Sequence, residues 1–226
     1  MSKMKKKEMK SLLDEYGKLY TCAVSDAIDE LDLEPGFMDA QIRPIWPGAR
    51  MIGFAGTMKF IPSEEELEED VMAKLGPYIR KLPKFPVICV DMSNMMIAAG
   101  LGQSTSRILQ RLGVRGGLVD GGVRDIAQVI DLKFPLFARG IICSSVRGRM
   151  VINFDAVMQP IECGGRTVTP GDLVFGDING VVVVKQESLE TVLEKAKEII
   201  STDEWWFEQL ESGREPAEIE KERPLP

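Results

Sequence analysis

GVRGGLVDGGVRD, residues 113–125, is the stretch of sequence that says most about the fold. It predicts a strand over 117–120, then a glycine-rich turn, then a short helix over 125–131 with Arg124 and Asp125 at its start. Glycines permit positive φ angles and close backbone approach, and the free amides at a helix start favour an anion. A strand, a tight turn and a helix in this order indicate a layered α/β domain.

The Arg124-Asp125 pair carries the chemistry of this stretch. An arginine offers a bidentate fork to a carboxylate, and an aspartate holds a hard cation through oxygen. Side by side they suit an α-keto acid, whose carboxylate and keto oxygen can both be engaged. The alternative is a surface Arg-Asp pair after a tight turn, and spacing alone favours that alternative because such dipeptides are common.

A second glycine-rich stretch, AAGLGQST, covers residues 98–105. It has the form of a loop that enters a helix, and its backbone amides can cradle an anion. The alternative is a plain turn between a strand and a helix. The stretch is not a dinucleotide-binding fingerprint, because Gly-Leu-Gly is followed by Gln-Ser-Thr without a third glycine.

Strands and helices alternate through the middle of the chain, and a run of short strands follows. Apolar spacing predicts helices over 11–31, 101–112 and 189–200. The acidic run 63–70 predicts the first turns of another helix. Predicted strands cover 51–60, 86–90, 135–138 and 181–184, and the last is apolar throughout, as in a strand buried on both faces. We predict an α/β fold with mixed sheets and flanking helices.

No linker or repeat divides the chain, so we predict a single domain over 1–226. The charged, proline-rich segment 214–226 predicts a flexible tail. Residues 205–207 (WWF) predict helix packing on the protein's own core or on a neighbouring subunit.

Composition limits the chemistry that the chain can perform. It has 226 residues with 28 Lys and Arg against 35 Asp and Glu, a net charge of -7, which gives no basic footprint for direct binding to nucleic acid. It has no histidine, which excludes Ser-His and Cys-His pairs and an imidazole base. Catalysis is left to carboxylates, Arg, Lys, backbone amides or a hard metal.

The four cysteines are widely spaced and match no zinc pattern, so we expect them to be reduced and mostly packed in or near the core. No apolar run is long enough to span a membrane, and no signal peptide opens the chain, so we expect a cytoplasmic protein without membrane partners.

Several phrases together resemble one known family. They are VSDAIDEL (24–31), IRPIWPGARMIGFAGTMKF (42–60), GVRGGLVDGGVRD (113–125), FPLFARG (134–140), PIECGGRTVTPGDLVFGD (160–177) and NGVVVV (179–184). In order and spacing they are similar to the class II pyruvate aldolases, which act on 4-hydroxy-4-methyl-2-oxoglutarate and 4-carboxy-4-hydroxy-2-oxoadipate. The same family includes the regulator-of-ribonuclease-activity-A proteins.

The resemblance implies a swivelling-type β/β/α core, and trimers or hexamers with active sites at subunit interfaces. It also implies a divalent metal, Mg²⁺ or Mn²⁺, rather than a Schiff-base lysine. In this sequence Arg124 matches the arginine that binds the substrate carboxylate and keto oxygen, and Asp125 matches the metal ligand. The segment that holds the pyruvyl carboxylate through backbone amides matches Gly100, Leu101, Gly102 and Gln103.

Gln103 departs from the aldolase pattern. Active aldolases resemble one another in an acid separated from the Arg-Asp pair by 20 intervening residues, and here that position is Gln103. Glutamine can hydrogen-bond a metal-bound water, but it does not attract the cation or a proton by charge. A second acid comes from a neighbouring subunit in the aldolases; Asp203 and Glu204 lie in roughly that region, where a solvated helix face is the favoured interpretation.

Other polar residues near these stretches have two interpretations each. Asp120 can orient the glycine-rich turn through hydrogen bonds, which is the favoured interpretation, or it can have a direct catalytic role. Arg139, Arg147 and Arg149 can add positive field near the site, or they can be ordinary surface arginines.

Two functions follow from the resemblance and the Arg124-Asp125 pair. The first is a divalent-metal-dependent lyase on small 2-oxo acids, with retro-aldol cleavage to pyruvate, oxaloacetate decarboxylation or both, through a metal-stabilised enolate. Its predicted catalytic residues are Arg124, Asp125 and Gln103. The alternative is a noncatalytic protein that binds and regulates an RNA-processing enzyme on the same scaffold, which the neutral Gln103 favours.

Overall fold

The structure is a computed structural model, and it describes residues 5–64 and 71–224. Its helices are α1 (Lys6–Tyr16), α2 (Thr21–Glu30), α3 (Val71–Ile79), α4 (Gln103–Arg111), α5 (Ile126–Asp131), α6 (Leu189–Glu211) and α7 (Pro216–Glu222). Its strands are β1 (Arg43–Pro44), β2 (Met51–Pro62), β3 (Pro86–Asp91), β4 (Ala99–Leu101), β5 (Gly117–Val123), β6 (Leu136–Ile141), β7 (Met150–Ile152), β8 (Ile161–Cys163), β9 (Arg166–Val168), β10 (Leu173–Asp177) and β11 (Gly180–Val184).

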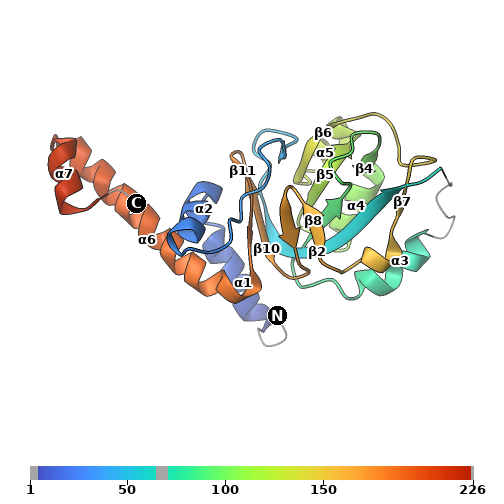
Figure 1. Ribbon diagram of the computed structural model, residues 1–226, viewed down its shortest axis with the longest axis horizontal. Helices are drawn as coiled ribbons and strands as arrows, with labels where there is room; N and C mark the ends of the chain where they lie inside the picture. The colour runs from blue at the N-terminus through green and yellow to red at the C-terminus, as the bar shows by residue number, and fades with distance from the viewer. Residues whose placement is uncertain (1–4, 65–70, 225–226) are drawn as a thin grey trace.

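Within the described residues, nine strands form one mixed sheet in the order β1-β6-β5-β3-β2-β10-β11, with β4 beside β5 and β7 beside β2 (Figure 1). The pairs β2–β3, β3–β5, β4–β5 and β5–β6 are parallel. The flanking strands β1, β7, β10 and β11 pair antiparallel, and β8 and β9 form a separate hairpin. β3 and β5 are buried at every position, as expected for parallel strands covered on both faces.

Three groups of buried side chains hold the layers together. Helices α1, α2 and α6 pack on β2, β10 and β11 around Tyr16, Phe54 and Phe175. The β8–β9 hairpin contributes Ile161 and Cys163 to a second group, which also contains Phe137 and Leu118. The third group joins β3, β4, β5 and β6 to α5.

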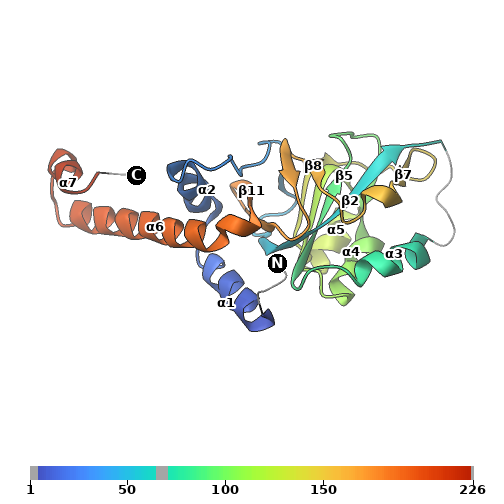
Figure 2. The same ribbon diagram turned by 60° about the horizontal axis from the view of Figure 1, so that its bottom comes forward.

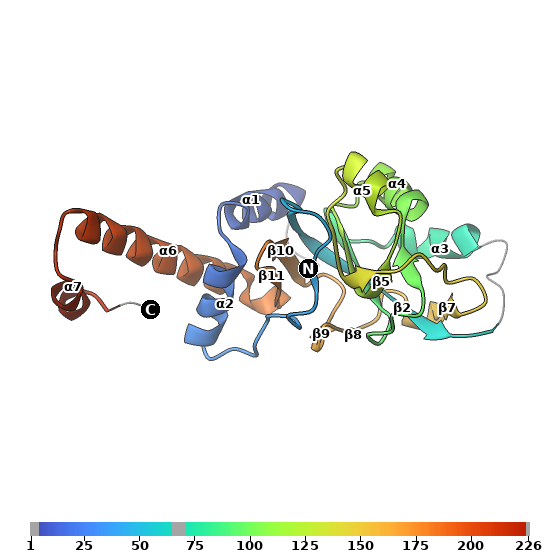
Figure 3. The same cartoon turned by 90° about the horizontal axis from the view of Figure 1, so that it is seen from above.

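Figure 3 shows α1, α2 and α6 toward one end of the sheet and α4 and α5 toward the other.

The predicted α/β fold with a mixed sheet and flanking helices is confirmed. The strands predicted over 51–60, 86–90 and 181–184 correspond to β2, β3 and β11. Val181–Val184 within β11 is buried along its whole length, as its unbroken apolar run predicts.

The helical segment predicted over 11–31 is two helices, α1 and α2, separated by residues 17–20. The second helix starts at a carboxylate from a distant strand. Asp177 on β10 accepts hydrogen bonds from the Thr21 backbone N–H at 2.8 Å and the Thr21 hydroxyl at 2.7 Å. A side-chain oxygen that satisfies free amides fixes where a helix begins.

Of two other predicted segments, one lies mostly outside the described residues and one contains a helix that was not expected. Most of the acidic run, residues 65–70, lies outside the described residues, and α3 follows it. The segment predicted as a flexible tail contains α7. Its Ile219 is buried, and the Trp206 indole N–H of α6 donates to the Arg223 carbonyl at 2.8 Å.

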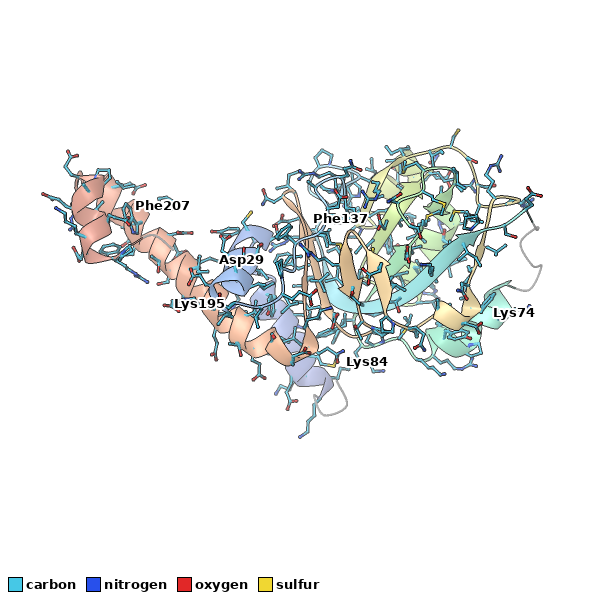
Figure 4. All side chains as sticks on the ribbon, viewed as in Figure 1. Asp29, Lys74, Lys84, Phe137, Lys195 and Phe207 are labelled. Carbon is cyan, nitrogen blue, oxygen red and sulfur yellow. The ribbon has the colours of Figure 1, made fainter. Side chains whose placement is uncertain are left out.

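Helix α6 extends beyond the sheet and carries α7 at its outer end (Figure 2). Phe207 lies near that end and is 61% exposed, while its neighbour Trp206 is buried (Figure 4). Of the residues 205–207 that were expected to pack, Trp206 therefore packs within the chain, whereas Phe207 does not. Among the described helices, none combines the length and the apolar character needed to cross a membrane.

All four cysteines are free, but two are more exposed than expected. Cys89 and Cys163 are buried in the core, whereas Cys22 and Cys143 lie at the surface. Burial raises the pKa of the Cys89 and Cys163 thiols, which keeps both protonated near neutral pH.

We expect Tyr16→Phe to lower the free energy of unfolding by about 1–2 kcal/mol, because it leaves a buried carbonyl without its donor. The Tyr16 hydroxyl is buried and donates to the Leu189 carbonyl at 2.7 Å, which joins α1 to the start of α6. Urea unfolding at one protein concentration measures the change. Tyr20→Phe is the matched control, since the Tyr20 hydroxyl bonds Asp203 at the surface; equal losses in both variants would contradict the prediction.

Candidate active site

The two glycine-rich stretches meet because β4 pairs with β5. The strands are parallel, with Leu101 opposite Val123, and the Arg124 N–H donates to the Leu101 carbonyl at 3.1 Å. Directly after this contact, the segment that follows β4 enters α4 at Gln103, and the segment that follows β5 enters α5 at Ile126. The residues that follow both strands therefore lie at one edge of the sheet.

Gly102 is the point of closest approach. A Cβ atom added there would lie 2.7 Å from Asp125 Oδ2 and 3.0 Å from Arg124 Cγ. Both distances are too short for a side chain while Arg124 and Asp125 keep their positions, so this arrangement needs glycine at position 102. The next residue, Gln103, donates its backbone N–H to Asp125 Oδ2 at 3.1 Å. The Asp125 carboxylate is thereby held at the first turn of α4.

Asp125 has a left-handed backbone with a φ of +59°. Aspartate is one of the few residues other than glycine that adopt this conformation readily. Arg124 Nε lies 3.6 Å from Asp125 Oδ2, and both side chains are about two-fifths exposed. This ion pair is open to water and therefore weak, which leaves both groups accessible to a ligand.

The predicted glycine-rich turn before Arg124 is wrong, since Gly121 and Gly122 belong to β5. A Cβ atom on Gly121 would come within 2.8 Å of Met92 Cβ, and one on Gly122 would collide with Ile142. These glycines are needed because neighbouring segments press on the strand, which is the other common use of glycine in a sheet.

A cavity of about 230 Å³ opens at this edge. Its polar lining comes from Ser104, Thr105, Arg124, Asp125, Ser145 and Arg147, and the rest comes from Phe60, Leu75, Ala99, Gly100, Gly102, Val146 and Ile152. Two arginines and one aspartate are among its lining residues, in a chain whose net charge is -7. The cavity is thus a local positive site, suited to an anion.

The structure brings most of the predicted site residues together. Gly100, Gly102, Arg124 and Asp125 line the cavity. Leu101 is buried and points into the core, so only its backbone is available. Gln103 is half-buried in the first turn of α4.

Two of the four predicted amide donors already have partners. The Gly102 N–H donates to Thr105 Oγ1 at 3.1 Å, and the Gln103 N–H donates to Asp125. A ligand carboxylate that used these amides would have to replace both bonds. The role of this segment in holding a carboxylate stays a prediction.

Sequence reasoning missed several cavity residues. Ser145 comes from the segment after β6, where an isolated bridge joins it to Ala99. Phe60, Leu75 and Ile152 come from β2, α3 and β7. Arg147, expected as a source of positive field, does line the cavity. The signal that could have found Ser145 is its place two residues before Arg147, in a polar segment that follows a strand.

Asp120 does not orient a turn in β5, contrary to expectation. Its carboxylate accepts from the Gly164 N–H at 2.8 Å and from Arg139 Nε. Arg139 also donates to Asp39 at 2.8 Å. This network ties the β8–β9 turn and the 36–41 segment to β5 and β6. It also engages the Arg139 guanidinium, which is therefore not a free positive group beside the cavity.

Asp203 and Glu204 lie far from the cavity within one chain. They are on the outer half of α6, at the opposite end of the molecule from β4 and α4 (Figure 2). Asp203 accepts from the Tyr20 hydroxyl at 3.1 Å, and Glu204 is exposed. No group of three or more His, Cys, Asp or Glu that could hold a metal occurs in the part of the chain that the structure describes.

Comparison with known proteins identifies the family of the chain. A family model described as "RraA-like: Aldolase/RraA" matches residues 21–183. The chain belongs to this RraA-like family, which confirms the resemblance seen in the sequence.

Two sequence relatives and two solved structures show the breadth of the family. Protein DlpA of Legionella pneumophila is 30% identical over 206 residues, which are 91% of this chain but 32% of DlpA, so this chain spans about a third of that relative. A "putative 4-hydroxy-4-methyl-2-oxoglutarate aldolase" of Halalkalibacterium halodurans is 29% identical, with 85% of each chain covered. An uncharacterized protein of Pseudomonas syringae has a TM-score of 0.80 at 30% identity, covering 93% of this chain and 96% of that one. RraAS2 of Streptomyces coelicolor, described as an unusual member of the RNase ES inhibitor family, has a TM-score of 0.75 at 23% identity, covering 86% and 96%, and shares the fold.

We expect the stabilisation from Asp39 to vanish at low pH. The Gln41 N–H, and then the Arg139 guanidinium, hold the pKa of Asp39 below its usual value of 3.8. A carboxyl whose pKa is lower in the folded state stabilises it above the unfolded pKa, and this is lost as pH falls through the folded pKa. The melting temperature of Asp39→Asn should therefore lie below wild type from pH 5 to 7, with the gap closing below about pH 4. Asp131→Asn, at an exposed position, is the control; a gap that stays constant to pH 3 would contradict this.

Proposed function

We propose that this protein is a divalent-metal-dependent lyase that acts on small 2-oxo acids. The observation that carries the proposal is the cavity lined by Arg124, Arg147 and Asp125, beside the ends of β4 and β5. An anionic ligand is favoured there, and a carboxylate next to a keto oxygen matches a guanidinium fork beside an oxygen ligand for a cation.

The residues present fit a magnesium-type ion. Such ions keep several waters and are often bound through one or two carboxylates together with substrate oxygens. Asp125 supplies one carboxylate, oriented by the Gln103 N–H and about two-fifths exposed. When bound, Mg²⁺ or Mn²⁺ supplies Lewis-acid polarisation of the keto oxygen.

Arg124 performs two tasks in the proposed reaction. It binds the pyruvyl carboxylate and keto oxygen, and it stabilises the negative charge that develops on the keto oxygen as the bond between C3 and C4 breaks. The electron pair of that bond remains with the pyruvyl half as an enolate. Decarboxylation of oxaloacetate gives the same enolate, so one arrangement of Arg124 serves both reactions.

Proton transfer is left to water in this proposal. Arg124 and Asp125 are partly exposed, so water reaches C3 and supplies the proton that converts the enolate to pyruvate. Ser104 and Ser145 line the same cavity, and we assign their hydroxyls the orientation of that water.

A second candidate is the noncatalytic regulator of an RNA-processing enzyme, because the neutral Gln103 stands where the aldolases resemble one another in an acid. Because both functions occur on the same fold, only a measurement of activity distinguishes the lyase from the regulator.

The first test of the lyase is release of pyruvate from oxaloacetate and from 4-hydroxy-2-oxo acids, with Mg²⁺, Mn²⁺ or chelator. We expect Asp125→Ala to reduce wild-type release to the level seen with chelator, and Arg124→Lys to reduce it roughly 10²-fold because a bidentate fork is lost. Asp131→Ala, at the end of α5, is the control that keeps activity. Absence of metal-dependent release in wild type would leave the regulator as the better candidate, to be tested by recovery of a ribonuclease or helicase from host lysate.

The effect of Gln103 is tested by adding the missing charge. We expect Gln103→Asp to tighten Mn²⁺ binding roughly tenfold, because a second carboxylate beside Asp125 attracts the cation and its bound water. Titration followed by the paramagnetic signal of free Mn²⁺ measures this without a substrate. Gln128→Asp adds the same charge on α5 and controls for the overall change in charge; equal tightening in both variants would count against a role for position 103.

A further inference from the structure

An apolar cavity of about 90 Å³ lies between α3, α4 and the sheet. Helix α4 lines it with Thr105, Ile108 and Leu109, followed by Leu112, and α3 contributes Leu75, Tyr78 and Ile79. The floor comes from β2 and β3, including Met58 and Ile88. None of the described residues that line this cavity carries a charge.

Both threonine hydroxyl groups on its wall are already engaged. Thr57 Oγ1 donates to the Gln159 carbonyl at 2.6 Å, and Thr105 Oγ1 exchanges hydrogen bonds with the Gly102 backbone. Water placed there would lack the two to four polar partners that hold an ordered water. The cavity therefore favours an apolar group.

This apolar cavity adjoins the cavity at Arg124 and Asp125. The two share five wall residues: Phe60, Leu75, Gly100, Thr105 and Ile152. The charged cavity and the apolar cavity therefore lie next to each other across these residues. A small-molecule site of this kind has a mainly apolar wall and a few polar groups that fix orientation.

The apolar cavity is also open at one side. Ile108 is 39% exposed and Leu112 is 46% exposed, although both line it. Gly56 lies at its floor, where any side chain would collide with Leu82. The space is smaller than the ~150 Å³ that accommodates benzene, so it suits a short alkyl chain.

We propose that this cavity binds a short apolar substituent on C4 of a 4-hydroxy-2-oxo acid. The inference rests on the proposed lyase function and specifies its substrate class. The carboxylate of the substrate lies at Arg124, and the C4 substituent passes the shared wall into the space lined by Ile108 and Leu109. The preferred substrate thus carries one carboxylate, at the pyruvyl end, and a hydrocarbon chain at the other.

The chemistry of such a substrate balances without any further reactant. The bond between C3 and C4 breaks, and its electron pair stays on the pyruvyl half. The C4 hydroxyl loses its proton and C4 becomes the carbonyl carbon of an aldehyde. A proton from water then adds to C3, so the products are pyruvate and a short apolar aldehyde.

Binding of uncleavable analogues tests the proposal. We expect affinity, measured by calorimetry with Mg²⁺ present, to rise from pyruvate to 2-oxopentanoate to 2-oxohexanoate, by about fourfold for each methylene that enters the cavity. We expect Ile108→Glu, which places a charge at the wall, to remove this gain. Ile130→Glu is the matched control, since Ile130 is 42% exposed on α5 and is not among the cavity residues; it should keep the full gain.

A second measurement separates this inference from the proposed function. Hexanoate, which lacks the keto group, should shift the methyl resonances of Ile108 and Ile79 in a titration followed by NMR. Pyruvate that binds with no gain for longer chains would overturn the apolar subsite and leave the lyase standing. No binding of pyruvate, with hexanoate still shifting these methyl groups, would overturn the lyase and support the apolar site. Hexanoate that leaves them unmoved would overturn the subsite.

Discussion

The parallel pairing of β4 with β5 is the contact on which the candidate site depends. It places Leu101 opposite Val123, so the two segments that follow start their helices at the same edge of the sheet. Ligand sites in α/β proteins form at the carboxyl ends of parallel strands for this reason. The absence of a side chain at Gly102 then lets Asp125 turn back onto α4. Without both contacts, Arg124 and Asp125 would be an ordinary surface pair.

The positive charge at the cavity depends on which arginines already have carboxylate partners, and composition alone does not reveal this. Arg124, Arg139 and Arg147 look alike in the sequence. Arg139 is bound by Asp120 and Asp39 and supports the neighbouring strands. Arg124 has a long, exposed contact with Asp125, and Arg147 lines the cavity. Arg124 and Arg147 are held less tightly by carboxylates than Arg139 is, so they make a positive site on an acidic protein. This site attracts anions to this edge of the sheet.

Local periodicity was enough to predict the elements that are stabilised by their own pattern, such as β2, β3 and β11. It failed where a distant segment decides the structure. Gly121 and Gly122 are typical of a turn, yet they extend β5 because Met92 and Ile142 press on it. Likewise, Arg124 and Asp125 could be predicted from one motif, whereas Phe60, Leu75 and Ile152 come from three separate elements that only the fold brings together.

Helix α4 contributes residues to both the charged cavity and the apolar cavity. Thr105, Ile108, Leu109 and Leu112 recur at the helical spacing of three and four residues and so share one face. The first turn of that helix is fixed by the bond from Gln103 to Asp125, which therefore also sets where Ile108 and Leu112 lie relative to Arg124. In the proposed lyase, bond cleavage uses residues 124 and 125, whereas chain length is sensed one to two turns along α4. Under that proposal, substitutions at 108 or 112 change the accepted substituent without altering the groups that act on the keto acid.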